Sequence, residues 1–168
     1  MTEKTNVVLI GMPGAGKSTL GVVLAKIANK GFVDTDLLIQ AHCGATLQQL
    51  IDMKGVQEFL DIENEVLGNV EADDSVIATG GSAVYSAEAM SHLSDIGTIV
   101  YLEISFESLV ERLVDLQDRG VVMKRGLSMS LHDLYEERVP LYRRYADVIV
   151  NIDGLSITAA ARKVASLL

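Results

Sequence analysis

The sequence predicts an α/β protein in which helices cover both faces of a five-stranded parallel sheet. Two observations predict this fold class. Short, continuous apolar runs, typical of strands buried on both faces, alternate along the chain with segments of helical periodicity. The first run also leads directly into a glycine-rich turn that opens a helix. Strands and helices that alternate in this way form parallel sheets, and ligands bind at the carboxyl ends of such strands.

Each expected strand is a short apolar run. The runs cover residues 6–10, 32–33, 75–78, 98–102 and 148–150. The second run leads into the acidic segment Asp34-Thr35-Asp36, and the third leads to the glycine pair Gly80-Gly81. We therefore expect carboxylates and a glycine turn at the carboxyl edge of the sheet.

Helical periodicity fills the segments between these strands. Helices are expected over residues 17–29, 86–93, 105–114, 131–144 and 156–168. A helical pattern also runs from residue 37 to residue 69, broken by Gly44 and Gly55, and we interpret residues 37–72 as a helical insertion. Residues 117–129 form a mixed polar segment between two of the helices.

Length, charge and cysteine content narrow the class of protein. With 168 residues, 49% of them hydrophobic and 22% charged, the chain has the size and composition of one globular domain. Its 14 basic and 23 acidic residues give a net charge of −9, which argues against a nucleic-acid partner. Cys43 is the single cysteine, so no internal disulfide can form. Because no apolar run approaches the roughly 18 residues of a membrane span, we expect a cytoplasmic protein without membrane contact.

Residues 11–18, GMPGAGKS, match the phosphate-binding pattern G-x-x-x-x-G-K-[ST] in full. The match follows an expected strand and opens an expected helix, which is the context that the motif requires. Glycines let backbone N–H groups turn toward phosphate oxygens, Lys17 supplies a positive charge, and the Ser18 hydroxyl is placed to bind Mg²⁺. The expected nucleotide-binding residues are Gly11, Met12, Pro13, Gly14, Ala15, Gly16, Lys17, Ser18 and Thr19. The motif alone does not distinguish hydrolases, switches and transferases.

Nearly the whole chain resembles the shikimate kinase family, small kinases that transfer the γ-phosphate of ATP to a hydroxyl of a small cyclic acid. The resemblance rests on five landmarks in the order in which the family has them. They are the phosphate loop, Asp34-Thr35-Asp36, Gly80-Gly81, Arg119, and Arg138 within the segment ERVPLY. This resemblance implies a single three-layer P-loop kinase domain, in which residues 37–72 bind the substrate and residues 117–129 form a mobile lid.

The resemblance also implies a role for each landmark residue. Asp36 would accept a hydrogen bond from the reacting hydroxyl, and Asp34 would contact Mg²⁺ through water. Gly80 and Gly81 would let the substrate touch the backbone, and Arg138 would bind the substrate carboxylate through two hydrogen bonds. Structural alternatives stay open: Asp36 as a helix N-cap, the glycines as a tight turn, and Arg138 in a surface ion pair.

Arg119 lies where the family has an arginine in the lid that closes over ATP and neutralises charge on the transferred group. Gly120 follows it where the family usually has proline, and the neighbours Lys124 and Arg125 could share its task. The catalytic residues that we expect are therefore Lys17, Asp36 and Arg119.

The sequence departs from the family pattern on the acceptor side. Leu60 follows Phe59 where the family normally has an arginine, the second ligand of the substrate carboxylate. Residues 55–111 contain no Lys or Arg that could replace it, and Glu63 remains in the same segment. A charge-assisted hydrogen bond contributes roughly 1.5–3 kcal/mol, so its loss would weaken shikimate binding tenfold to a hundredfold. Ser82 is a milder departure, because it replaces a third glycine.

We therefore expect a monomeric kinase that uses ATP and Mg²⁺ to convert shikimate to shikimate 3-phosphate, with Arg138, alone or with Arg143, holding the acceptor carboxylate. Two alternatives remain. One is a paralogue that phosphorylates another small hydroxy acid, amino acid or sugar, which would explain Leu60. The other is a nucleotide-binding regulatory module without kinase turnover, and the presence of Asp36, Arg119 and Arg138 argues against it.

Overall fold

The computed structural model describes residues 3–118 and 130–168, with the backbone alone for residues 115–118. Its strands pair in parallel in one five-stranded sheet, in the order β2-β3-β1-β4-β5. The strands are β1 (Asn6–Ile10), β2 (Gly31–Asp34), β3 (Ser75–Ala78), β4 (Gly97–Glu103) and β5 (Val148–Asn151). The expected parallel α/β class is therefore confirmed.

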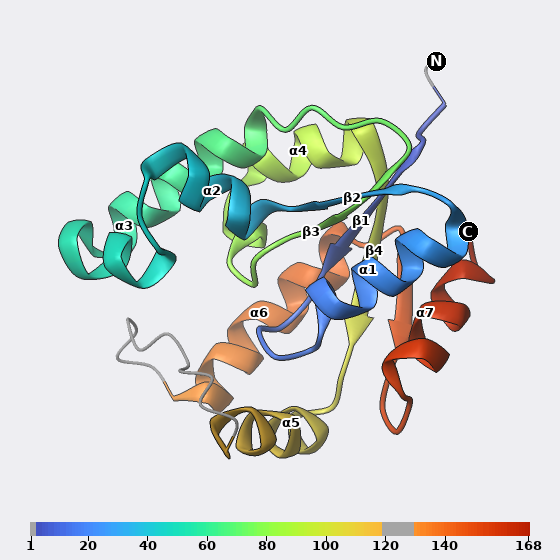
Figure 1. The fold of residues 1–168 in the computed structure, drawn as a ribbon. Coiled ribbons are helices and arrows are strands. Elements are labelled where there is room, and N and C mark those ends of the chain that lie inside the picture. Colours follow the sequence, from blue (N-terminus) through green and yellow to red (C-terminus); the bar gives the residue numbers. More distant parts are fainter. Residues whose placement is uncertain (1–2, 119–129) are drawn as a thin grey trace.

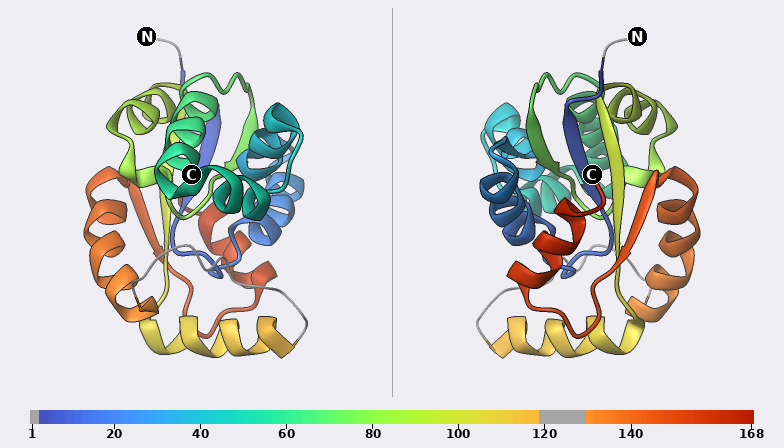
Figure 2. Two further views of the ribbon diagram at one scale, coloured as in Figure 1. Left: turned by 90° about the vertical axis from the view of Figure 1, so that its left-hand side faces the viewer. Right: turned by 90° about the vertical axis from the view of Figure 1, so that its right-hand side faces the viewer.

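Helices cover both faces of this sheet. Figures 1 and 2 show α1 (Lys17–Ala28) and α7 (Ile157–Ala165) on one face, and α4 (Ala87–Ile96) and α6 (Leu131–Tyr145) on the other. Helix α5 (Phe106–Asp118) lies across the edge at which β4 ends. The remaining elements, α2 (Thr35–Cys43), α3 (Leu47–Gly68) and the short 3-10 helix η1 (Ala83–Tyr85), lie beyond the carboxyl ends of β2 and β3. Apart from the insertion, the expected boundaries differ from these by at most four residues.

The core follows from the central position of β1. All five residues of this strand are buried, because β3 and β4 flank it and helices cover both its faces. Leu9 pairs with Ala78 of β3 and Val100 of β4 in the middle of the sheet. A second, smaller apolar cluster joins α2 to α3 through Ile39, Leu47, Leu50 and Phe59.

The expected helical insertion forms two helices with a kink in the second. Gly44 ends α2 in the left-handed conformation with φ 65°, and a capping box between Thr46 and Gln49 starts α3. Gly55 interrupts α3 with φ 84° and ψ 168°. Both breaks therefore occur at the two glycines that interrupt the helical pattern in the sequence.

The start of α2 corrects one sequence interpretation. The N-cap is Asp34, whose Oδ1 accepts a hydrogen bond from the backbone N–H of Asp36 at 3.0 Å. Asp36 therefore lies in the first turn of α2 and is not its cap. Asp34 therefore caps the helix, and Asp36 follows it at the carboxyl edge of the sheet.

The topology places the loops after β1 and β3 at the carboxyl edge of the sheet. Strand β1 leads to α1 on one face, whereas β3 leads through η1 to α4 on the opposite face (Figure 2). In α/β proteins ligands bind where neighbouring strands are followed by connections to opposite faces. The residue after β3 is also joined directly to β1, because the backbone N–H and the hydroxyl of Thr79 both donate to the Leu9 carbonyl, at 3.2 and 2.8 Å.

Candidate active site

The phosphate loop connects β1 to α1, as expected. Gly14 and Gly16 have φ values of 86° and 91°, a conformation that residues with a Cβ rarely adopt. Gly16 is the residue before α1, so the helix begins with Lys17 and its first N–H groups lie at the end of the loop. This arrangement is an anion-binding site made of backbone N–H groups and a helix N-terminus.

Lys17 is buried, with 7% of its surface exposed, and its side chain folds back onto the phosphate loop. Its Nζ donates to the carbonyls of Gly11 and Met12, at 2.7 and 2.9 Å. Arg112 of α5 also holds the loop, since its Nη1 donates to the carbonyl of Ala15 at 2.8 Å. The contact of Arg112 could not be predicted from a local motif, because it spans 97 positions along the chain.

Ser18 and Asp34, the two expected metal residues, lie together. The Ser18 hydroxyl donates to Oδ2 of Asp34 at 2.9 Å, which joins the first turn of α1 to the end of β2. A hydroxyl and a carboxylate side by side supply the oxygen donors that Mg²⁺ prefers, so these residues fit the ion. Within the part of the chain that the structure describes, no group of three His, Cys, Asp or Glu residues could hold a metal ion.

Two carboxylates lie over Gly80. A methyl group placed on the Gly80 Cα would be 2.9 Å from Oδ1 of Asp36 and 3.1 Å from Oε2 of Glu63. Glu63 comes from α3 and is 2% exposed, and its Oε1 accepts a 2.6 Å hydrogen bond from the Ser82 hydroxyl. Ser82, which replaces the third glycine, therefore contacts the buried carboxylate of Glu63 in the insertion.

The guanidinium of Arg138 lies over the next glycine. A methyl group placed on the Gly81 Cα would be 2.9 Å from Nη1 of Arg138 and 2.7 Å from Cδ of Pro13 in the phosphate loop. Arg138 is 6% exposed, so the alternative of a surface ion pair is wrong. The structure thus brings Asp36, Gly80, Gly81, Arg138 and the phosphate loop to one place.

Two tyrosines surround the guanidinium. Tyr142 donates to the Gly81 carbonyl at 2.6 Å and stacks on Tyr101 of β4, with 5.2 Å between the ring centroids. Burial raises the pKa of Tyr142, so its phenol remains a hydrogen-bond donor at neutral pH. On the other side, Nε of Arg138 donates to the hydroxyl of Tyr85 at 3.2 Å, and this hydroxyl donates to Oε2 of Glu137.

Other expected residues lie elsewhere. Arg143 does not join Arg138, because its Nη2 makes a 2.6 Å ion pair with Glu103 at the end of β4. Leu60 is half-buried and packs against the apolar cluster that joins α2 to α3. Arg119, Lys124, Arg125 and all but the first two residues of the expected lid, residues 117–129, lie outside the described residues.

Comparisons with known proteins relate the chain to one family. The sequence profile of the family described as "Shikimate kinase" matches residues 13–168. A shikimate kinase of Francisella tularensis subsp. novicida is 36% identical over 170 residues, which cover 100% of this chain and 97% of the relative. Another from Francisella philomiragia is 35% identical with the same coverage.

Solved structures of shikimate kinases are also similar to this chain. The chain is similar to a shikimate kinase from Acinetobacter baumannii in complex with shikimate, with a TM-score of 0.82, 30% identity, and coverage of 97% of this chain and 92% of that one. A shikimate kinase from Bacteroides thetaiotaomicron also has a TM-score of 0.82 and 30% identity, with 97% of both chains covered. Among residues 3–118 and 130–168, no helix is long and apolar enough to cross a membrane. Because the profile spans almost the whole sequence and the relatives match it from end to end, the chain belongs to the shikimate kinase family of small-molecule kinases.

Proposed function

We propose that this protein transfers the γ-phosphate of ATP to a hydroxyl of shikimate, which gives shikimate 3-phosphate. The observation that carries the proposal is the placement of Asp36 and Arg138 over the successive glycines Gly80 and Gly81, beside the phosphate loop. Shikimate has both groups that suit this pair, a ring hydroxyl for the carboxylate and a carboxylate for the guanidinium. The similarity to an Acinetobacter baumannii shikimate kinase in complex with shikimate supports this choice of acceptor.

On the nucleotide side, backbone N–H groups of the phosphate loop hold the phosphates of ATP. Lys17 exchanges its contacts with the Gly11 and Met12 carbonyls for phosphate oxygens, and Arg112 keeps the loop in place through Ala15. Ser18 and Asp34 would hold Mg²⁺, Asp34 through water, and the ion would supply positive charge to neutralise the phosphates of ATP. Arg119 remains our proposal for the lid arginine.

On the acceptor side, Asp36 orients the reacting hydroxyl. The hydroxyl oxygen forms a bond to the γ-phosphorus, the bond from this phosphorus to the bridging oxygen of ADP breaks, and the hydroxyl proton passes to the Asp36 carboxylate. Asp34 links both sides of the reaction, because it contacts Ser18 and also caps the helix whose first turn carries Asp36. The cap thus fixes the carboxylate relative to the nucleotide.

We also propose that Arg138 holds the acceptor carboxylate without a second arginine from α3. The family resemblance predicts an arginine at position 60, whereas Leu60 packs with the apolar residues between α2 and α3. Arg143 is engaged with Glu103 at the end of β4. Shikimate binding therefore depends on how firmly one guanidinium is positioned.

ADP release measured with Mg-ATP, alone and with a panel of hydroxy acids, amino acids and sugars, tests this function. We expect release that depends on shikimate. Release with a different acceptor alone would make the protein a paralogue with that substrate, and the absence of acceptor-dependent ADP release with every compound of the panel would favour the regulatory module. We propose that the enzyme acts as a cytoplasmic monomer, which sedimentation analysis of the purified chain would test for its oligomeric state.

A further inference from the structure

The hydrogen bond from Arg138 to Tyr85 limits how this arginine can bind an anion. A guanidinium offers five N–H donors in a rigid fork, and a carboxylate can meet it at the edge formed by Nε and one Nη or at the edge formed by the two Nη groups. Nε of Arg138 donates to the Tyr85 hydroxyl at 3.2 Å, and the guanidinium carbon lies 5.2 Å from the centre of the Tyr85 ring. The edge that contains Nε is therefore occupied.

One atom of the other edge lies at the acceptor side of the site. Nη1 of Arg138 lies against Gly81, next to Gly80, over which the carboxylates of Asp36 and Glu63 lie. We propose that Tyr85 is a positioning residue for the acceptor, because it occupies Nε of Arg138 and so presents the Nη1–Nη2 edge to the acceptor carboxylate. This inference rests on the proposed function, since it concerns how the same acceptor is held.

Glu137 determines which group donates and which accepts in the contact between Tyr85 and Arg138. The Tyr85 hydroxyl has one proton and donates it to Oε2 of Glu137, so its lone pairs are left to accept from Nε. Burial and the hydrogen bond to Glu137 raise the pKa of Tyr85, and the phenol therefore keeps its proton at neutral pH. Arg138 thus donates to Tyr85, and Tyr85 donates to Glu137, in a chain of hydrogen bonds between α6 and η1.

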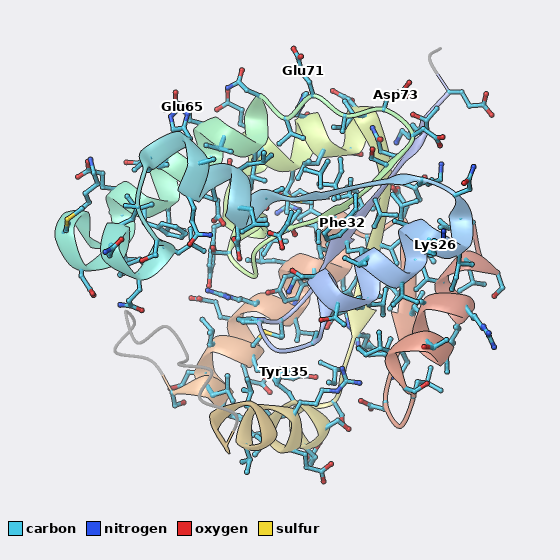
Figure 3. The ribbon with its side chains drawn as sticks, in the orientation of Figure 1. Lys26, Phe32, Glu65, Glu71, Asp73 and Tyr135 are labelled. Atoms are coloured by element: carbon cyan, nitrogen blue, oxygen red, sulfur yellow. The ribbon has the colours of Figure 1, made fainter. Side chains whose placement is uncertain are left out.

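Tyr135 provides a matched control on α6, the helix that carries Arg138. Tyr135 is three residues before Arg138, and its hydroxyl donates to the Ile104 carbonyl at 2.8 Å while its ring contacts Phe106 at the start of α5. Figure 3 shows Tyr135 between α5 and α6, on the side of α6 toward α5. Tyr135→Phe therefore removes a hydroxyl of the same kind away from the guanidinium.

The test compares steady-state kinetics of the wild type, Tyr85→Phe and Tyr135→Phe. A hydrogen bond that involves a charged group contributes enough to change affinity by about tenfold, so we expect Tyr85→Phe to raise the KM for shikimate by that factor. The kcat and the KM for ATP should change less than about twofold, because Tyr85 touches neither the reacting atoms nor the phosphate loop. Tyr135→Phe should retain the wild-type KM for shikimate.

Two further measurements separate positioning from a general loss of structure. In an Arg138→Lys background, which has no Nε, Tyr85→Phe should have little additional effect on the KM for shikimate. The methyl ester of shikimate, which lacks the charge, should be used equally by the wild type and Tyr85→Phe. Equal shikimate KM values in the wild type and Tyr85→Phe, or the same tenfold loss in the lysine background, would overturn the inference.

Failure of the proposed function gives a different result. If the wild type neither turns over shikimate nor binds it in calorimetry, both the proposed acceptor and the role of Tyr85 are wrong. If the wild type uses shikimate and Tyr85→Phe uses it with unchanged KM, only the role of Tyr85 is wrong.

Discussion

The hydroxyl of Ser82 donates a 2.6 Å hydrogen bond to Oε1 of Glu63, and so joins the turn after β3 to the second helix of the insertion. Glu63 is 2% exposed, and its other carboxylate oxygen lies against Gly80 beside Asp36. A hydrogen bond that a carboxylate accepts is stronger than one between neutral groups, because the acceptor carries charge. This contact therefore helps to fix the insertion relative to the acceptor site.

Ser82→Ala should lower the free energy of unfolding by about 1–3 kcal/mol, since Glu63 loses a donor that water cannot easily replace. Urea unfolding followed by circular dichroism would measure the change. Ser166→Ala is the matched control, because the Ser166 hydroxyl contacts the Lys163 carbonyl at an exposed position. Equal stability of Ser82→Ala and the wild type would show that the contact adds nothing to the fold.

Asp36→Asn should lower kcat by about a hundredfold or more, because an amide cannot take the proton of the reacting hydroxyl. The KM for ATP should stay close to that of the wild type. Asp52→Asn, an exposed change on α3, serves as the control and should retain full activity. A kcat within a few fold of the wild type would remove the proton-accepting role proposed for Asp36.

Asp34→Asn and Asp34→Ala should separate the two roles of this residue. Asparagine caps helices as well as aspartate does, so Asp34→Asn should keep the melting temperature but require more Mg²⁺ for half-maximal activity. Asp34→Ala should also lose about 1 kcal/mol of stability with the cap. Mg²⁺ titrations and thermal melts of both variants give these values, and an unchanged Mg²⁺ requirement in both would contradict the metal role.

Leu60→Arg should lower the KM for shikimate, because it would add a second cation for the acceptor carboxylate. One charge-assisted hydrogen bond corresponds to about a tenfold to hundredfold change in affinity. Met53→Arg, on the same helix with 70% of its surface exposed, adds the same charge away from the site. A KM for shikimate that is unchanged or higher in a folded Leu60→Arg variant would refute this interpretation of position 60.

Asp153 should contribute to stability in a pH-dependent way. Burial raises the pKa of this carboxyl, but hydrogen bonds from the backbone N–H and the hydroxyl of Ser105 outweigh burial, and the net pKa is lowered from 3.8. A lowered pKa in the folded state gives stability that is full above the unfolded value and is lost as the pH falls through the folded value. The difference in unfolding free energy between the wild type and Asp153→Asn should therefore be largest near neutral pH and shrink below pH 3.8. A difference that is constant from neutral pH to strongly acidic pH would contradict it.

The sequence was sufficient for the elements that depend on local patterns. The phosphate loop, the five strands and the breaks at Gly44 and Gly55 follow from periodicity and glycine positions, and the structure has them at those places. The start of α2 was harder to predict, because Asp34 and Asp36 are both good N-cap residues and the hydrogen bond between them decides which one caps.

Contacts between distant segments could not be predicted from such patterns. Arg112 holds the phosphate loop, and Tyr85 holds Arg138, but neither residue belongs to a motif with a fixed spacing. The contact between Glu63 and Ser82 depends on how α3 packs beside the turn after β3. Each of these contacts is set by tertiary packing, which a single sequence does not display.

The two groups that lie over the glycines of the turn after β3 are also close to each other. The carboxylate lies over Gly80 and the guanidinium over Gly81, and successive Cα atoms are about 3.8 Å apart. In the proposed binding mode, a ligand that reaches both groups holds its hydroxyl and its anion at a short, defined separation. A ring keeps that separation by itself, whereas an open-chain hydroxy acid loses torsional freedom on binding. We therefore expect the turn to select acceptors by shape and stiffness as well as by charge.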